Sequence, residues 1–271
     1  MITAVTDVGD PRLDAFRWRD RQLASRLDRL DNVGAGLFIA EGDLVVDRAL
    51  STGHQPVALL CEETMGQLLS PRVDPSVEIF VGSDDLRSEV TGLGVPLRAT
   101  GLFRRPALRD PLELLAHSTR IVVAEAIDNP TNLGAITRSA AALGWSGLLL
   151  CAGSADPLAR RALRVSMGSG LVMPFARLSP HHNLTQLLSD AGFVSYALTP
   201  DVAARDIAEI QHNPSERVAL LMGSERDGLD ENTMTNATQM VRIPMHSEID
   251  SLNVGAAAAI ALHMLGPNAH Q

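Results

Sequence analysis

The stretch IVVAEAIDNPTNLGAITRSAAALG, residues 121–144, decides the fold of this chain. Its first part, 121–128, is an apolar run typical of a buried strand, and an alanine-rich helix follows the polar turn, with Gly144 as its expected C′ residue. Asn132 is expected to cap that helix. Arg138 comes about 9 Å of helical rise later, so the two side chains can converge on one anionic group where the strand ends. A capped helix with a surface arginine explains the segment equally well.

The same alternation of strand and helix continues toward the C-terminus. Further strands are expected at 147–151, 192–198, 218–223 and 240–244, and a helix is expected from 253 to 265. Alternating strands and helices predict an α/β fold with a mostly parallel sheet, in which ligands bind at the carboxyl ends of the strands.

The N-terminal part predicts a smaller α/β domain. Short apolar runs at 36–42, 56–63 and 77–82 are separated by helix-compatible stretches. Before them, 11–30 has helical spacing, and its arginines and aspartates nearly cancel, which favours a solvated helix face.

The boundary between the two parts is expected where prolines and arginines interrupt any long periodicity. The predicted division is an N-terminal domain over 1–101, a linker over 102–117 and a C-terminal domain over 118–271.

The composition excludes several function classes. All 23 basic residues are arginine, and without lysine there is neither a Walker A phosphate loop nor a Schiff-base enzyme. The net charge of −9 means that RNA would have to be bound by local arginine patches. Cys61 and Cys151 are too far apart for a zinc cluster, so no metal is expected. No signal peptide or membrane span is predicted, so we expect a soluble protein located in the cytoplasm.

Two further segments carry candidate site residues. LLMGSERDGLD, 220–230, ends a strand in a glycine turn whose backbone can approach a ligand closely. In 241–265, Ser251 and Asn253 place a hydroxyl and an amide at the start of a helix made of small residues. Each segment alone also has a purely structural explanation.

Taken in order, the three segments resemble the SpoU (TrmH) family of the SPOUT superfamily. The resemblance rests on Asn132 and Arg138, then GSERDGL at 223–229, then IPM at 243–245 with SLN at 251–253, and it extends to 156–175. It implies an RNA ribose 2′-O-methyltransferase that uses S-adenosylmethionine, with rRNA favoured over tRNA as substrate. It also implies a C-terminal SPOUT domain with a deep trefoil knot, which forms a homodimer through the knotted region.

The resemblance also implies the roles of individual residues. The catalytic positions are Asn132, Arg138, Glu225, Ser251 and Asn253, and the cofactor-binding positions are Thr199, Gly223, Ile243 and Leu252. Arg226 stands where the family usually has glycine, which leaves the shape of this loop open.

A guanidinium stays protonated at neutral pH. We therefore expect Arg138 to fix a phosphate and stabilise the developing alkoxide, with Glu225 or Ser251 orienting it. Deprotonation of the 2′-hydroxyl by Arg138 itself is the less favoured alternative.

The N-terminal domain resembles the ribosomal-protein fold that binds kinked RNA, which implies that it recruits the substrate, although a scaffold role stays open. The expected RNA-binding residues are Arg104, Arg105, Arg109, Arg160, Arg161 and Arg164.

Two rival functions remain at this point. A nucleotide-binding oxidoreductase is disfavoured because no GxGxxG follows a strand. The other rival is a catalytically inactive RNA-binding or nucleotide-binding module on the same fold.

Overall fold

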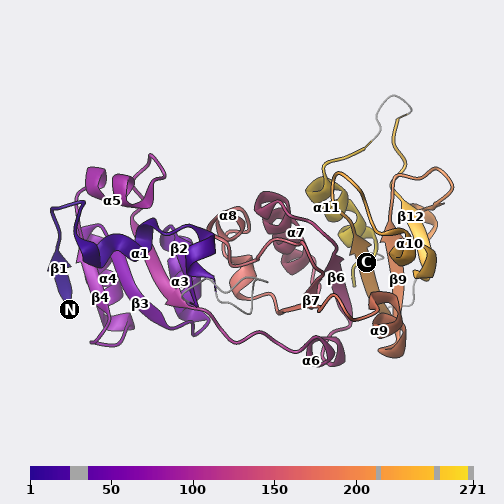
Figure 1. Cartoon of the computed structure of the whole chain (residues 1–271), viewed down its shortest axis with the longest axis horizontal. Coiled ribbons are helices and arrows are strands. Elements are labelled where there is room, and N and C mark those ends of the chain that lie inside the picture. Colours follow the sequence, from indigo (N-terminus) through magenta and orange to yellow (C-terminus); the bar gives the residue numbers. More distant parts are fainter. Residues whose placement is uncertain (25–35, 212–214, 247–250, 268–271) are drawn as a thin grey trace. The chain divides into compact units, whose positions relative to one another are not determined.

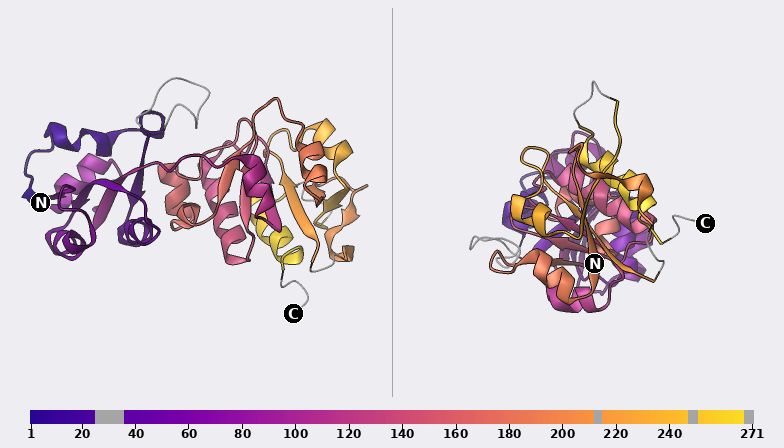
Figure 2. Two further views of the ribbon diagram at one scale, coloured as in Figure 1. Left: turned by 90° about the horizontal axis from the view of Figure 1, so that it is seen from below. Right: turned by 90° about the vertical axis from the view of Figure 1, so that its right-hand side faces the viewer.

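The computed structural model describes residues 1–24, 36–211, 215–246 and 251–267, and they form two compact units. The first unit comprises Met1–Ala107 together with Leu158–Leu171. The second comprises Leu108–Pro157 and Val172–Gln271. Figures 1 and 2 show the elements of each.

The first unit is built on a five-stranded sheet in the order β1-β4-β3-β5-β2. Strand β5 is antiparallel to β3 and β2, whereas β1, β4 and β3 are parallel. The strands are β1 (Ile2–Ala4), β2 (Leu37–Glu41), β3 (Pro56–Cys61), β4 (Glu78–Val81) and β5 (Ala99–Arg104). The helices are α1 (Asp14–Arg17), α2 (Asp20–Leu23), α3 (Asp43–Ser51), α4 (Glu63–Leu69), α5 (Asp84–Thr91) and α8 (Arg160–Val165).

The helix expected over 11–30 is not continuous. Short 3-10 and α-helical turns cover Pro11–Leu13, Asp14–Arg17 and Asp20–Leu23, and residues 25–30 lie outside the described part. The chain is extended at Trp18 and Arg19, with ψ of 140° and 159°. Despite this break, Leu13, Phe16 and Leu23 all enter one core. The periodicity of the segment therefore marked the buried residues correctly, although the helix is not continuous.

The second unit contains the predicted parallel sheet. Seven strands lie in the order β10-β12-β9-β11-β6-β7-β8, and all their pairings are parallel. The strands are β6 (Arg120–Ala124), β7 (Gly147–Leu150), β8 (Phe175–Arg177), β9 (Phe193–Leu198), β10 (Arg205–Asp206), β11 (Arg217–Met222) and β12 (Gln239–Arg242). The helices are α6 (Pro111–Ala116), α7 (Pro130–Ala142), α9 (Leu184–Asp190), α10 (Glu231–Asn236) and α11 (Val254–Met264).

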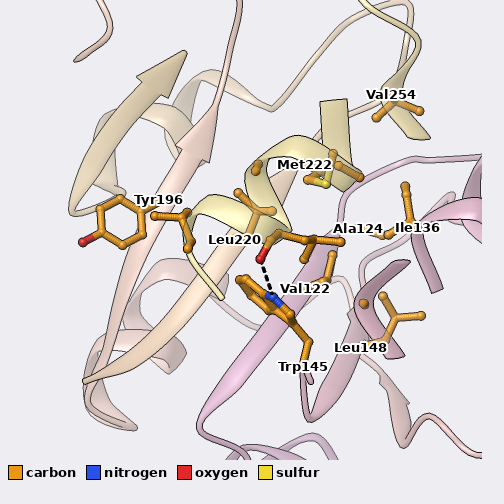
Figure 3. Packing of buried hydrophobic residues seen from close by; sticks show 14 of the residues in the cluster. Val122, Ala124, Ile136, Trp145, Leu148, Tyr196, Leu220, Met222 and Val254 are labelled. Carbon is orange, nitrogen blue, oxygen red and sulfur yellow. Dashed lines mark hydrogen bonds between the residues drawn. The ribbon is translucent and has the colours of Figure 1, made fainter. Parts of the chain in front are cut away.

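Two apolar clusters cover this sheet. One joins alternate residues of the strands to α7 and α11, as Figure 3 shows for Val122, Ile136 and Leu220. The other joins the intervening strand residues to α6 and α9. Both faces of a parallel sheet are thereby buried, which explains why its strands are continuous apolar runs.

Two side-chain donors hold the C-terminal end of α11. Trp145 Nε1 donates to the carbonyl of Leu262 at 3.0 Å, and Arg120 Nε donates to that of Leu265 at 3.0 Å (Figure 3 shows the Trp145 bond). These carbonyls lack helical partners, and a cation near them is favourable. The contacts fix α11, whose first residues follow Asn253.

The boundary between the units, after Ala107, falls inside the expected linker over 102–117, but this segment is largely structured. Residues 102–104 complete β5, where Leu102 and Phe103 are buried. Residues 111–116 form α6, and its Leu114 and Leu115 enter the core of the second unit. The apolar residues of the supposed linker therefore belong to the two units.

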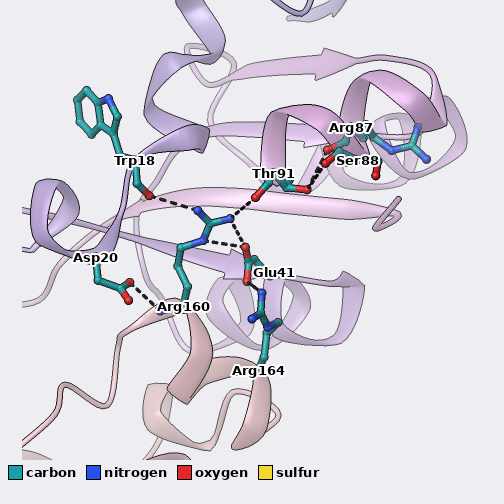
Figure 4. A network of polar contacts seen from close by, with 8 residues as sticks. All are labelled: Trp18, Asp20, Glu41, Arg87, Ser88, Thr91, Arg160 and Arg164. Atoms are coloured by element: carbon teal, nitrogen blue, oxygen red, sulfur yellow. Dashed lines mark hydrogen bonds and ion pairs between the residues drawn. The ribbon is translucent and has the colours of Figure 1, made fainter. Parts of the chain in front are cut away.

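A second difference concerns Leu158–Leu171, which was expected in the C-terminal domain and packs with the first unit. The cause is a buried ionic network (Figure 4). The carboxylate of Glu41, fully buried, accepts from Arg160 Nε at 2.8 Å and pairs with Arg164 at 2.5 Å. Asp20 accepts from the backbone N–H of Arg160 at 2.9 Å. Arg160 also donates to the carbonyl of Thr91 at 2.9 Å.

Candidate active site

The loop after β11 closes on itself as a tight hairpin. Ser224 and Gly228 exchange two backbone hydrogen bonds of 3.1 Å each. A Cβ on Gly223 would lie 2.0 Å from the carbonyl carbon of Gly228, so glycine is required there. The predicted glycine turn is thus present, and Glu225 and Arg226 are exposed at its tip. The hairpin closes with Arg226 in its tip.

Hydrogen bonds between side chains connect the three segments singled out in the sequence. Asn132 Nδ2 donates to Glu225 Oε1, and Asn253 Nδ2 donates to Asn132 Oδ1 at 3.1 Å. Asn253 Oδ1 in turn accepts from the N–H groups of Gly255 and Ala256, at 2.9 and 3.3 Å, as the N-cap of α11. Asn132 is 8% exposed, so its amide is committed to these two partners.

The prediction that Asn132 caps the helix is wrong. Asn129 is the N-cap, accepting from the N–H of Thr131 at 2.9 Å, and Pro130 occupies the first helical position. The helix therefore begins earlier than expected. Asn132 lies within its first turn, where its side chain is available to bridge the other two segments.

Arg138 does not meet Asn132 in this chain. At 3.6 residues per turn, positions six apart point about 120° away from each other around a helix. Arg138 is accordingly exposed on α7, and its guanidinium makes no hydrogen bond or ion pair with any residue that the structure describes. The convergence of the two side chains expected from the sequence is absent.

A pocket of about 520 Å³ lies at the carboxyl ends of β9, β11 and β12. This is the edge of the sheet where parallel α/β folds bind ligands. Its lining includes every residue expected to contact the cofactor and three of those expected to be catalytic: Thr199, Gly223, Ile243, Leu252, Glu225, Ser251 and Asn253. Asn132 and Arg138 do not line it.

The pocket also contains residues that sequence reasoning missed. Met222, Met234 and Met245 contribute apolar wall, and Arg226 lies at its edge. Each methionine follows or lies within a segment already singled out, so proximity to the motifs was the available signal. Glu125, the first charged residue after β6, contacts the same wall through Asp230 and Thr233, as set out below.

The six arginines expected to bind RNA fall into two groups. Arg104, Arg109 and Arg161 are exposed, and no described residue pairs with their guanidinium groups. By contrast, Arg160 and Arg164 are engaged by Glu41, and Arg105 Nε donates to the carbonyl of Leu37 at 3.1 Å.

The described ranges (1–24, 36–211, 215–246 and 251–267) contain no group of three or more histidine, cysteine or acidic side chains arranged to hold a metal ion. Their helices include none long and apolar enough to cross a membrane.

Comparison with known proteins gives concordant results. The model of the SpoU rRNA Methylase family matches residues 119–263. An uncharacterized tRNA/rRNA methyltransferase of Mycobacterium bovis is 35% identical over 98% of this chain and 94% of its own length. The Bacillus subtilis 23S rRNA (guanosine(2553)-2′-O)-methyltransferase RlmP is 28% identical over 84% of this chain and 88% of its own.

Solved structures agree with the sequence relatives. The AdoMet-bound rRNA methyltransferase of Sinorhizobium meliloti superposes with a TM-score of 0.81 at 26% identity, covering 97% of this chain and 96% of that one. The family model spans the second unit from β6 to α11, including all three hydrogen-bonded segments. The chain belongs to the SpoU rRNA methylase family.

Proposed function

We propose that this protein transfers a methyl group from S-adenosylmethionine to a ribose 2′-hydroxyl of RNA, with rRNA favoured over tRNA. The observation that carries the proposal is the chain of hydrogen bonds from Glu225 through Asn132 to Asn253 beside the pocket. It unites the three motif segments at the ligand-binding edge of the sheet. Relatives named as rRNA 2′-O-methyltransferases support the reaction class.

The pocket suits S-adenosylmethionine. Its walls are apolar at Leu198, Met222 and Ile243, and Gly223, which has no side chain, brings the main chain to the lining. Apolar walls with a few fixed polar groups are what an adenosyl ligand needs. When bound, S-adenosylmethionine supplies a methyl group carried on a positively charged sulfur.

The residues beside the pocket divide the remaining tasks. The Glu225 carboxylate is held by Asn132 and orients polar groups of the incoming ribose, while Ser251 and Asn253 line the same pocket. We assign to Arg138 the task of holding an RNA phosphate and stabilising negative charge on the 2′-oxygen. Its guanidinium has no competing partner among the described residues, and an arginine stays protonated at neutral pH.

The assembly is part of the same proposal. We infer a homodimer formed through the exposed face of α11. This face contributes to a groove of about 710 Å³, whose lining includes Ile207, Ile210, Ala259, Ile260 and Met264. An exposed apolar groove on a helix is typical of an interface between subunits. The deep trefoil knot expected of the family belongs to this proposal too, supported by the parallel strand order and by the packing of α11 on α7.

The first unit is proposed to recruit the RNA. Support comes from its exposed arginines, Arg104 and Arg161, which no described residue neutralises. We expect the protein to act in the cytoplasm, where the proposed substrate RNA is found.

The test is transfer of tritiated methyl groups to bulk RNA, followed by alkaline hydrolysis, which leaves 2′-O-methylated dinucleotides uncut. We expect label in that resistant fraction, and its loss in Glu225→Gln. Label on bases would contradict the ribose 2′-hydroxyl as the acceptor. No transfer despite demonstrated binding of S-adenosylmethionine would favour the alternative of an inactive RNA-binding or nucleotide-binding module.

A further inference from the structure

Glu125 lies directly after β6 and faces the start of α10. Its backbone N–H donates to the carbonyl of Met222 at 2.8 Å, extending the contact between β6 and β11. Its side chain then uses both oxygens: Oε1 accepts from the N–H of Asp230 at 2.6 Å and Oε2 accepts from Thr233 Oγ1 at 2.8 Å. Thr233 is only 5% exposed, so this hydroxyl depends on the carboxylate for its partner.

These bonds do not serve to cap α10, because the helix already has a cap. Asp230 Oδ1 accepts from the N–H of Asn232 at 2.8 Å. The N–H that Glu125 binds belongs to Asp230 itself, where the hairpin from Gly223 ends. Glu125 therefore holds the end of the hairpin.

The hairpin and the following turn form one wall of the pocket, comprising 223–229 and Met234. Two side chains, one directly after β6 and one in the first turn of α7, make polar contacts with the hairpin and with the residues that follow it. Asn132 binds Glu225 near the hairpin tip, and Glu125 binds the far end. The two residues flank the turn between β6 and α7. Residues on either side of this turn therefore hydrogen-bond to both ends of the hairpin segment.

The turn between β6 and α7 is held in place by its own conformation and packing. Ala126 has φ of 54°, a left-handed conformation that residues other than glycine adopt only where their surroundings enforce it. The surroundings are close: a Cβ on Gly153 would lie 3.5 Å from Ala126 Cα, and Ile127 accepts from the N–H of Ala155 at 2.8 Å. Movement of Glu125 is restricted accordingly.

Glu125 is also half-buried. A carboxylate in such surroundings binds N–H and O–H donors more firmly than one in water does.

We propose that Glu125 is a positioning residue of the methyl-transfer site. It tethers the segment 223–234, of which 223–229 and Met234 line the pocket, so that the cofactor pocket and Glu225 keep their relative places. The proposal rests on the proposed function and adds a residue that touches neither the pocket nor, by our assignment, the substrate. It acts through Asp230 and Thr233.

The experiment compares Glu125→Gln with Thr233→Val and Thr233→Ser. Glutamine keeps the size but offers only one acceptor, and valine removes the hydroxyl. We expect the Kd for S-adenosylmethionine, measured by calorimetry, to rise about tenfold in the first two variants. Serine should keep it within about twofold of the wild type, since it retains the hydroxyl. The double variant Glu125→Gln/Thr233→Val should be no weaker than the worse single one, because both remove the same tether.

If Glu125 had only a general structural role, its substitution would lower the melting temperature without the expected pattern of Kd changes. Hydrogen exchange gives a second readout that is specific to the hairpin. The amides of 224–230 should exchange faster in Glu125→Gln and Thr233→Val, and at the wild-type rate in Glu113→Gln. Glu113 is an exposed residue of α6 whose carboxylate has no partner among the described residues. Unchanged cofactor affinity, unchanged exchange, or additive losses in the double variant would each overturn the proposal. If the wild type transfers no methyl group to RNA, the proposed function fails. The cofactor affinity and the exchange rates of the variants still test whether Glu125 tethers the hairpin segment.

Discussion

Asn253 donates a hydrogen bond of 3.1 Å to Asn132 across 121 residues of sequence, and Asn132 in turn donates a hydrogen bond to Glu225. A side-chain amide has both a donor end and an acceptor end, which is why asparagine suits the middle of such a chain. The three segments are therefore coupled through one buried amide. Disturbing it should affect the site from both sides.

Asn132→Ala tests this coupling. The substitution leaves Glu225 without its donor and Asn253 Nδ2 without its acceptor, and each unsatisfied group costs about 1–3 kcal/mol. We expect methyl transfer to fall by about 10²-fold, the effect of ~2.7 kcal/mol on a rate. Steady-state assays with RNA and tritiated cofactor measure it.

The matched control is Asn183→Ala, which removes the N-cap of α9. It should cost about 1 kcal/mol of stability and leave the turnover intact. If Asn132→Ala merely lowered stability like Asn183→Ala and kept its rate, the hydrogen-bonded chain would have no part in catalysis.

Arg138 gives the second prediction. Arg138→Ala should lower kcat by about 10²–10³-fold, as removal of a charge-stabilising donor does, with the cofactor Kd unchanged because the residue does not line the pocket. Arg138→Lys should recover little, since an ammonium cannot reproduce bidentate contact with a phosphate.

Arg205→Ala serves as control for Arg138, because Arg205 is also an exposed arginine but lies next to Glu209. Retained turnover in Arg138→Ala contradicts the assignment. Nearly full activity in Arg138→Lys would show that positive charge suffices and that bidentate contact with a phosphate is not required.

Much of the second unit could be predicted because parallel strands are buried on both faces. The runs around Val122, Leu149 and Leu220 are apolar throughout, and each ends in a polar or glycine turn. Such runs specify strands independently of distant contacts. Seven of the nine residues expected to bind the cofactor or to be catalytic therefore line one pocket at the carboxyl edge of the sheet.

The rest depended on contacts that sequence patterns do not contain. Asn132 and Asn129 are both plausible caps, and only the position of the first helical turn distinguishes them. Arg160 and Arg164 resemble a basic RNA-binding patch until Glu41, more than a hundred residues away, is seen to bind them. Long-range ion pairs leave no periodicity, so Leu158–Leu171 was expected in the C-terminal domain although it packs with the first unit.

The third prediction concerns the RNA footprint. Each of Arg104→Ala, Arg109→Ala and Arg161→Ala should reduce the slope of log K against log salt concentration by about 1, because each removes about one phosphate contact. Filter binding over a range of salt concentrations measures the slope. Unaltered slopes in all three variants would show that RNA binds elsewhere.

The fourth prediction concerns the thiols. Burial raises the pKa of Cys61 and of Cys151 to about 12, from an unfolded value of 9.0. Both should therefore stay protonated and react slowly with a thiol reagent at pH 8 in the native protein, and quickly in urea. Because the folded pKa is raised, the associated stability is complete below pH 9 and is lost as the pH rises toward 12. Rapid labelling of the native protein at pH 8 contradicts the burial of these thiols.

The last prediction concerns Glu41, whose carboxylate is fully buried between Arg160 and Arg164. Removing one member of a buried ionic network leaves uncompensated charge, so Glu41→Gln should lower the free energy of unfolding of the first unit by about 3 kcal/mol. Glu62→Gln, which breaks an exposed pair with Arg98, should cost at most about 1 kcal/mol.

The two tryptophans of the chain make the measurement selective, because Trp18 lies in the first unit and Trp145 in the second. In a Trp145→Phe background, urea unfolding followed by fluorescence reports on Trp18, whose carbonyl also accepts from Arg160 at 3.2 Å. The midpoint should fall in Glu41→Gln and hardly move in Glu62→Gln. Equal midpoints for the two variants would mean that Leu158–Leu171 is held in the first unit by apolar packing alone.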